Sequence, residues 1–153
     1  MLTLDKIYHA AFVLKDVARK TDLIEAPRLS KDCQLYLKTE NLQVTGSFKV
    51  RGAYYKISTM SSDEREKGLI TASAGNHAQG VAYAAKLYGV PATIVMPTTT
   101  PLIKVNRTKG YGANVVLHGS VYDEACQKAL ELAEKSGATF VHPFNDETVA
   151  TGQ

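Results

Sequence analysis

Two short stretches hold the residues of this sequence that could do chemistry. One surrounds a lysine and reads Thr45-Gly46-Ser47-Phe48-Lys49-Val50-Arg51-Gly52-Ala53. The other follows downstream and reads Ser73-Ala74-Gly75-Asn76-His77-Ala78-Gln79-Gly80. A lysine amine that is held in place and partly deprotonated can attack an aldehyde and form a Schiff base. The first stretch therefore offers a candidate nucleophile in Lys49, and the alternative is an ordinary lysine exposed at the start of a helix.

The neighbours of Lys49 suit a nucleophile. A nearby cation and a dry pocket each lower the pKa of a lysine, and Arg51 lies two residues further on. Phe48, directly before the lysine, could supply a flat apolar surface. We therefore expect Arg51 and Phe48 to act on the lysine amine if it is reactive.

The second stretch predicts an anion site. A loop at the start of a helix points backbone N–H groups and the Ser73 hydroxyl at one place, where the helix dipole adds positive potential. Gly75 lets the backbone approach a ligand closely, and Asn76 offers both a donor and an acceptor. A carboxylate would fit there. The alternative is a tight strand-to-helix turn that is capped by Ser73 and Asn76.

The elements that must position these residues form a regular series. Apolar runs between turn residues predict four strands, at 69–72, 92–96, 114–117 and 139–141. Their spacing is that of a strand plus a crossover helix, which indicates an α/β fold with a mainly parallel four-stranded sheet and flanking helices. The loop that begins at Ser73 follows a strand, so it lies at the carboxyl edge of the sheet, where ligands bind.

Helical spacing and end signals complete the expected elements. Apolar residues at helical spacing predict a helix over 4–19, and a further strand is expected at 34–39. Ser47 is a plausible N-cap for the helix that carries Lys49. After 148 the sequence offers no closing helix.

Glycines and a serine mark other helix ends. Ser61 to Glu64 has the pattern of a capping box. Gly89 and Gly137 stand where left-handed residues end two helices, the second of which is expected over 120–136. These signals predict where the helices between the strands begin and end.

Composition excludes several classes of protein. The 153 residues suit one domain, and 44% apolar and 22% charged residues are ordinary for a globular protein. A net charge of +3 is too mild to favour nucleic acid, and no stretch is long and apolar enough to span a membrane. Cys33 and Cys126 lie far apart, which favours reduced thiols and a cytoplasmic location. No histidine has a partner at metal-ligand spacing, so we expect no metal.

Taken together and in this order, the two stretches resemble those of the fold-type II family of pyridoxal-phosphate enzymes. The match is best with the threonine dehydratases (threonine ammonia-lyases), and it runs from about Leu35 to Gln153. Further blocks agree, namely Lys38-Thr39-Glu40-Asn41-Leu42-Gln43, Val95-Met96-Pro97, Ile103-Lys104-Val105, Val116-Leu117-His118-Gly119 and His142-Pro143-Phe144-Asn145-Asp146. Because several separate blocks agree in order, the resemblance is specific.

The resemblance implies a role for each residue of the two stretches. Lys49 would hold pyridoxal 5'-phosphate through a Schiff base and later act as the base at the substrate α-carbon. Phe48 would flank the cofactor ring, and Asn76 would contact its 3-hydroxyl group. The residues around the substrate carboxylate would be Ser73, Ala74, Gly75, Asn76 and His77.

The implied reaction is a β-elimination. L-Threonine or L-serine would lose water and then ammonia, which leaves a 2-oxo acid, in either threonine catabolism or isoleucine biosynthesis. Serine racemases carry a serine where this chain has Ala74, and that serine acts as an acid–base group on the opposite face. Ala74 therefore favours elimination. The alternatives are a serine dehydratase or serine racemase relative, and a non-catalytic fragment that binds a partner.

The resemblance also implies that the chain is an N-terminal portion of a longer enzyme, which would form a homo-oligomer. The family's glycine-rich loop for the cofactor phosphate has no counterpart here, so we expect the isolated chain to hold the cofactor poorly. The expected division is a segment of a large domain at 1–48, a small α/β domain at 49–142, and a return to the large domain at 143–153.

Overall fold

The centre of the molecule is a four-stranded parallel sheet. The structure is a computed structural model that describes residues 1–153. The strands stand in the order β5-β4-β3-β6, and each neighbouring pair is parallel. Their bounds are β3 (Leu69–Ala72), β4 (Ala92–Met96), β5 (Asn114–Leu117) and β6 (Thr139–Phe140). The parallel sheet and the places of its strands are thereby confirmed.

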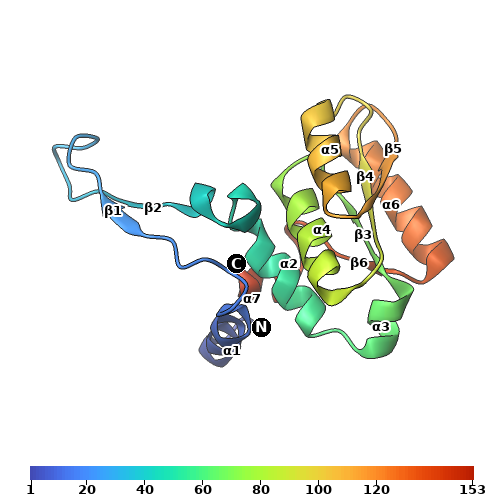
Figure 1. Cartoon of the computed structure of the whole chain (residues 1–153), viewed down its shortest axis with the longest axis horizontal. Helices are drawn as coiled ribbons and strands as arrows, with labels where there is room; N and C mark the ends of the chain where they lie inside the picture. The colour runs from blue at the N-terminus through green and yellow to red at the C-terminus, as the bar shows by residue number, and fades with distance from the viewer.

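Helices cover both faces of this sheet (Figure 1). One face carries α4 (Asn76–Tyr88) and α5 (Leu102–Gly110), with α2 (Lys49–Ser58) packed on α4. The other face carries α6 (Tyr122–Ser136). A short helix, α3 (Ser62–Lys67), connects α2 to β3.

The alternation of side chains along the strands divides the core in two. Successive residues of a strand point to opposite faces. Leu69 and Ile94 therefore pack in the larger cluster, with α2, α4 and α5. Ile70 and Val95 pack in the smaller cluster, against Ala125 and its neighbours on α6. These fully buried strands read as continuous apolar runs because both faces of the sheet are covered.

The end signals predicted at Ser61, Gly89 and Gly137 are confirmed. Ser61 Oγ accepts a hydrogen bond from Glu64 N at 3.2 Å, and the Glu64 carboxylate accepts one from Ser61 N at 2.8 Å. Gly89 and Gly137 have φ values of 65° and 71°, in the left-handed region that glycine adopts without strain.

The N-terminal region differs from the expectation. The first helix, α1 (Leu4–Leu14), ends before residue 19. Arg19 N donates to Gln43 Oε1 at 2.7 Å, and Arg19 O accepts from Gln43 Nε2 at 2.8 Å. The buried Gln43 side chain thus takes both backbone groups of Arg19, which lies beyond the end of the helix.

The strand expected at 34–39 belongs to an exposed hairpin. It is β2 (Tyr36–Lys38), and it pairs antiparallel with β1 (Leu23–Glu25), which the sequence did not predict. All the residues of both strands are exposed. The hairpin projects away from the parallel sheet (Figure 1).

The expectation that no helix closes the chain is wrong. Residues Glu147–Gly152 form α7, whose N-cap is Asp146. Asp146 Oδ1 accepts hydrogen bonds from Thr148 N at 2.8 Å and Val149 N at 3.1 Å. A Cβ atom on Gly152 would lie 2.8 Å from Gly52 Cα, so the close contact of α7 with α2 requires glycine there. The contact places α7 beside α1 as well (Figure 1).

Candidate functional site

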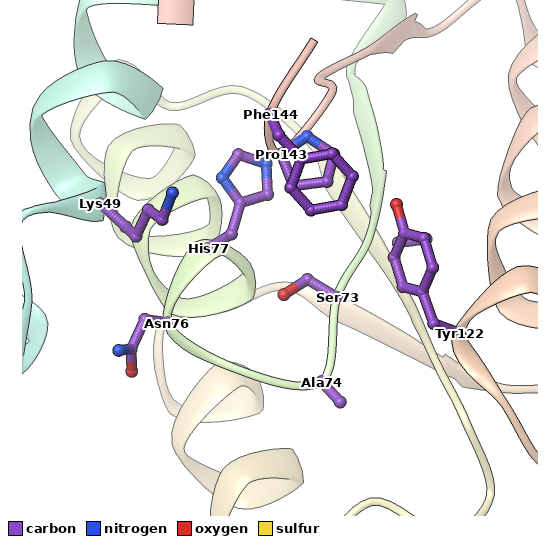
Figure 2. A pocket seen from close by; sticks show the side chains of 9 residues that line it. Lys49, Ser73, Ala74, Asn76, His77, Tyr122, Pro143 and Phe144 are labelled. Atoms are coloured by element: carbon purple, nitrogen blue, oxygen red, sulfur yellow. The ribbon is translucent and has the colours of Figure 1, made fainter. Parts of the chain in front are cut away.

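The two stretches meet at one pocket of about 320 Å³ beside the carboxyl end of β3. Five of the predicted site residues line it, namely Lys49, Ser73, Ala74, Asn76 and His77 (Figure 2). Phe48 and Gly75 adjoin these residues but do not line the pocket. The fold thus brings together residues that are distant in sequence.

A strained turn places Lys49 at the start of α2. Thr45 has φ 67° and Gly46 has φ 78°, and Thr45 is the one non-glycine residue in the left-handed region. Ser47 Oγ accepts a weak hydrogen bond from Lys49 N at 3.3 Å, although the N-cap position itself belongs to Phe48. The Lys49 amine lies 4.9 Å from the centre of the Phe48 ring and has no hydrogen-bond or ion-pair partner. Its amine is therefore not engaged by any other side chain.

Gly80 brings the second stretch close to Lys49. A Cβ atom at Gly80 would lie 2.9 Å from Lys49 O and 3.1 Å from Val50 N. Real Cβ atoms do not approach backbone so closely, so α4 can reach α2 only because residue 80 is glycine. The last residue of the second stretch thus positions the first residue of α2.

The loop between β3 and α4 leaves backbone donors free. The N-cap of α4 is Gly75, and no side chain caps this helix, so the predicted caps from Ser73 and Asn76 do not form. Ser73 Oγ instead accepts from Gly75 N at 3.2 Å, inside the loop. The first N–H groups of a helix have no intrahelical partner. Together with the dipole they make this end of α4 suitable for an anion.

His77 is buried and neutral. Its ring is 4% exposed, and Nε2 lies 3.1 Å from Val141 O. Burial lowers the pKa of His77 to about 4, since the interior disfavours the charged imidazolium. At neutral pH the imidazole therefore carries a single proton.

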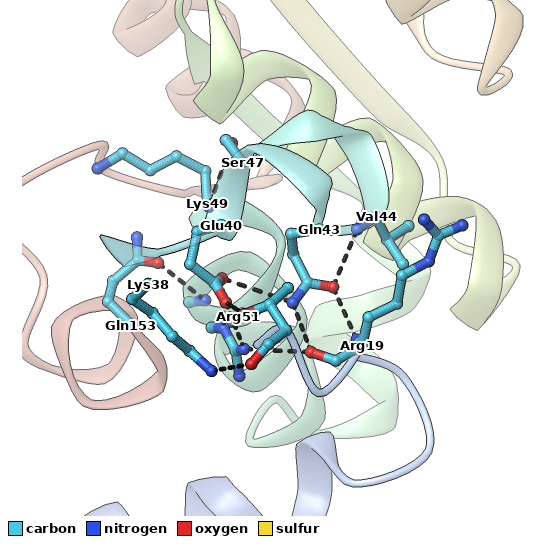
Figure 3. A network of polar contacts seen from close by, with 11 residues as sticks. Arg19, Lys38, Glu40, Gln43, Val44, Ser47, Lys49, Arg51 and Gln153 are labelled. Carbon is cyan, nitrogen blue, oxygen red and sulfur yellow. Dashed lines mark hydrogen bonds and ion pairs between the residues drawn. The ribbon is translucent and has the colours of Figure 1, made fainter. Parts of the chain in front are cut away.

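Arg51 does not face Lys49, contrary to the sequence-based expectation. Its guanidinium donates two hydrogen bonds to the Glu40 carboxylate, both at 2.9 Å. This pairing lowers the pKa of Glu40 to about 2. Figure 3 shows the pair within a network that also holds Gln43 and Arg19, while Lys49 points away from it. The Arg51 charge is thus balanced by Glu40.

The far wall of the pocket comes from residues to which the sequence assigned no role. Tyr122, the first residue of α6, and Pro143 and Phe144, after β6, line it. The Tyr122 hydroxyl is buried without a partner, and burial raises its pKa to about 12, so it remains protonated. Two features of the sequence could have indicated these residues. The helix that begins at Tyr122 starts near the carboxyl edge of the sheet, and Pro143-Phe144 belongs to a block of the family resemblance.

No group of three His, Cys, Asp or Glu side chains is arranged to hold a metal ion. No helix combines the length and the apolar character that crossing a membrane requires.

Comparison with known proteins yields one family and many relatives. A model of the family described as pyridoxal-phosphate dependent enzyme matches residues 14–153. The chain is 54% identical, over its whole length, to the L-threonine ammonia-lyase of Thermotoga maritima. The structure superposes with a TM-score of 0.88 on the processed form of threonine deaminase isoform 2 from Solanum lycopersicum, at 44% identity over 98% of the chain. On serine racemase from Dictyostelium discoideum the TM-score is 0.90, at 34% identity over 99% of the chain.

The chain spans half or less of the length of these relatives. It covers 39% of the Thermotoga protein, 43% of the tomato chain and 50% of the Dictyostelium chain.

Proposed function

The chain belongs to the family of pyridoxal-phosphate dependent enzymes, and from this we propose that it contributes the lysine and the substrate loop to a β-elimination reaction. L-Threonine or L-serine would lose water and ammonia and leave a 2-oxo acid. The relatives named as threonine ammonia-lyase and threonine deaminase support this substrate class.

One observation carries the proposal. Lys49 has a free amine in the same pocket as the uncapped start of α4. A covalent anchor for a carbonyl compound and an anion site for a carboxylate therefore stand side by side. An amino acid that reacts at its α-carbon needs both.

The pocket holds residues that fit the aldehyde and the ring of pyridoxal phosphate. Lys49 would hold the cofactor covalently, with Asn76 beside its ring, and Phe48 adjoins the pocket next to Lys49. When bound, the cofactor accepts the electron pair that is released at the substrate α-carbon. Lys49, once free of the cofactor, is the group of this chain that can take the α-proton. Tyr122 and Phe144 close the opposite side of the pocket.

The start of α4 would bind the substrate carboxylate. The Ser73 hydroxyl and the N–H groups at Asn76 and His77 supply the donors, since Gly75 N already donates to Ser73 Oγ. A Cβ on Gly75 would meet nothing within 4 Å, so the backbone is open to a ligand there. Ala74 lines the pocket but has no hydroxyl. A second acid–base group is therefore missing at this position, which favours elimination over racemisation.

The first test is covalent binding of the cofactor. The chain is mixed with pyridoxal phosphate, and the Schiff-base absorbance near the visible edge is recorded for the wild type and for Lys49→Ala. Borohydride reduction followed by peptide mass mapping then locates the adduct. We expect the band and the adduct at Lys49, and neither in Lys49→Ala; a chain without a Lys49-dependent band would support the non-catalytic alternative.

The second test is the reaction itself. L-Threonine is added to the loaded chain and 2-oxobutanoate is measured. A preference for L-serine would favour a serine dehydratase. The similarity to serine racemase supports a second candidate, a relative of the serine racemases. Formation of D-serine from L-serine would identify that activity.

The proposal extends to the cellular location, the oligomeric state and the domain division of the protein. Cys33 and Cys126 are both free, which suits a cytoplasmic protein. Exposed apolar side chains on α1, such as Tyr8 and Phe12, support burial against further protein, as in a homo-oligomer. We likewise propose the division of the chain into a large-domain segment at 1–48, a small α/β domain at 49–142 and a return to the large domain at 143–153.

A further inference from the structure

The wall of the pocket holds a buried nitrogen without a partner. His77 Nδ1 is shielded from solvent and makes no hydrogen bond. A buried acceptor without a donor is unfavourable in a folded protein. Such an atom requires an explanation beyond the packing of the ring.

The other ring nitrogen determines what Nδ1 can do. Nε2 lies 3.1 Å from Val141 O, which can only accept, so Nε2 carries the proton. Because the ring is neutral, Nδ1 presents a lone pair. A lone pair cannot bind a carboxylate, so the His77 side chain does not serve the anion site. The Nδ1 atom instead needs a hydrogen-bond donor.

The donor must come from the protein. Since solvent does not reach Nδ1, a ligand in the pocket does not reach it either without a movement of the wall. Figure 2 shows that the ring nitrogen turned toward α2 faces the Lys49 side chain. The Lys49 amine has only N–H groups to offer and no partner of its own.

The other titratable groups near His77 are already engaged. His142 Nδ1 accepts from Phe144 N and Asn145 N. Asp146 pairs with Lys56 at 2.9 Å and caps α7. The Tyr122 hydroxyl also lacks a partner, but it stands on the far wall of the pocket, whereas Lys49 lies on the side of the His77 ring nitrogen (Figure 2). Lys49 is therefore the donor placed to serve Nδ1.

We propose that His77 is a positioning residue for Lys49: whenever the lysine amine is not bonded to a carbonyl compound, it donates a hydrogen bond to His77 Nδ1. Val141 O fixes the ring in the required tautomer. The amine is then held at the pocket wall instead of over Phe48. The proposal deepens the proposed function, because it concerns the same lysine.

Nitrogen NMR of the histidine-labelled chain tests the contact without any cofactor. At neutral pH we expect the Nδ1 signal of His77 to show a hydrogen-bonded lone pair. In Lys49→Met it should move to the position of a free lone pair, while Nε2 stays unchanged. Attachment of pyridoxal phosphate to Lys49 should move the Nδ1 signal in the same direction. An Nδ1 signal that is the same in the wild type and Lys49→Met would overturn the proposal, whether or not the chain binds cofactor.

Two substitutions at His77 separate its two nitrogens. His77→Asn keeps an amide oxygen near the position of Nδ1 but loses the contact with Val141. His77→Gln can reach Val141 O but lacks the acceptor toward Lys49. We expect capture of pyridoxal phosphate at Lys49, followed by borohydride trapping, to be about tenfold slower in His77→Gln, equivalent to about 1.4 kcal/mol.

In His77→Asn a large part of the capture rate should return. Equal loss in both variants would assign the effect to the Val141 contact and overturn the proposal, as would wild-type rates in both. Circular dichroism and thermal unfolding of each variant show whether it is folded, and the comparison of the wild type with Lys49→Met remains decisive if either His77 variant is not.

Discussion

Two residues beyond Lys49, the charge of Arg51 is paired with that of Glu40. The Glu40 carboxylate accepts from Arg51 and also from Thr21 Oγ1 at 2.6 Å. Both charged side chains are about four-fifths buried, with 22% and 17% of their surface exposed. The pair ties the segment before Lys49 to the first turn of α2. The pair therefore holds the backbone around Lys49 in place.

The paired carboxylate makes stability depend on pH. The pKa of Glu40 is lowered to about 2 from an ordinary value of 4.5. Its contribution is therefore complete above 4.5 and is lost as the pH falls toward 2. We expect urea unfolding to show that Glu40→Gln costs about 1–2 kcal/mol at pH 7, less than the full shift implies because solvent screens part of the pair.

Near pH 2 the wild type and Glu40→Gln should have similar stability. Glu25→Gln, on the exposed hairpin, is the matched control and should change little at either pH. If Glu40→Gln lost the same stability at both values, the loss would come from packing and not from the charge.

Helix α4 shows how one residue without a side chain can position a site. Gly80 lies against the backbone of Lys49 and Val50, so the separation of α2 and α4 depends on it. The distance between the lysine and the loop that begins at Ser73 depends on the same contact. A larger residue would shift one helix relative to the other, because backbone atoms cannot move aside as the end of a side chain can.

Gly80→Ala is therefore expected to destabilise the chain. The added methyl group would overlap Lys49 O at 2.9 Å, and we expect a loss of about 1–3 kcal/mol in urea unfolding. Gly110→Ala is the control. Gly110 is also a helical glycine, the last residue of α5, but a Cβ there would meet nothing within 4 Å. It should be neutral or stabilising by up to about 1 kcal/mol. Equal effects of the two substitutions would contradict the close approach of α4.

Across the whole molecule, the features that could be predicted are those with local causes. The strands of the parallel sheet, the capping box at Ser61 and the glycine stops follow from neighbouring residues, and the structure has them. The path of the chain after α1 depends on Gln43, which is distant in sequence and binds both backbone groups of Arg19, so no local pattern could reveal it. The closing helix α7 did have a local signal, the N-cap Asp146, but its packing against Gly52 depends on the fold.

The same distinction applies to the candidate site. Lys49 and the loop from Ser73 to His77 were predicted because their residue types carry the chemistry. Tyr122 and Phe144 were not, because only the fold places the start of α6 and the segment after β6 at the pocket. Arg51 was expected to act on Lys49, but it pairs with Glu40. Glu40 lies eleven residues earlier, and nothing in the sequence indicated that the two side chains meet.

Unequal burial should give the molecule unequal local stability. Strand β3 has a neighbour on both sides and its residues are fully buried, whereas β1 and β2 pair only with each other and are exposed throughout. A two-stranded hairpin without a packed face is at best marginally stable. We expect hydrogen exchange, followed by mass spectrometry, to be close to the rate of an unstructured peptide over 23–38. Exchange over 69–72 and 92–96 should be slower by at least about a thousandfold, since opening there requires disruption of the main core. Similar protection in the two regions would show that the hairpin and the parallel sheet unfold as one cooperative unit, which their contacts do not support.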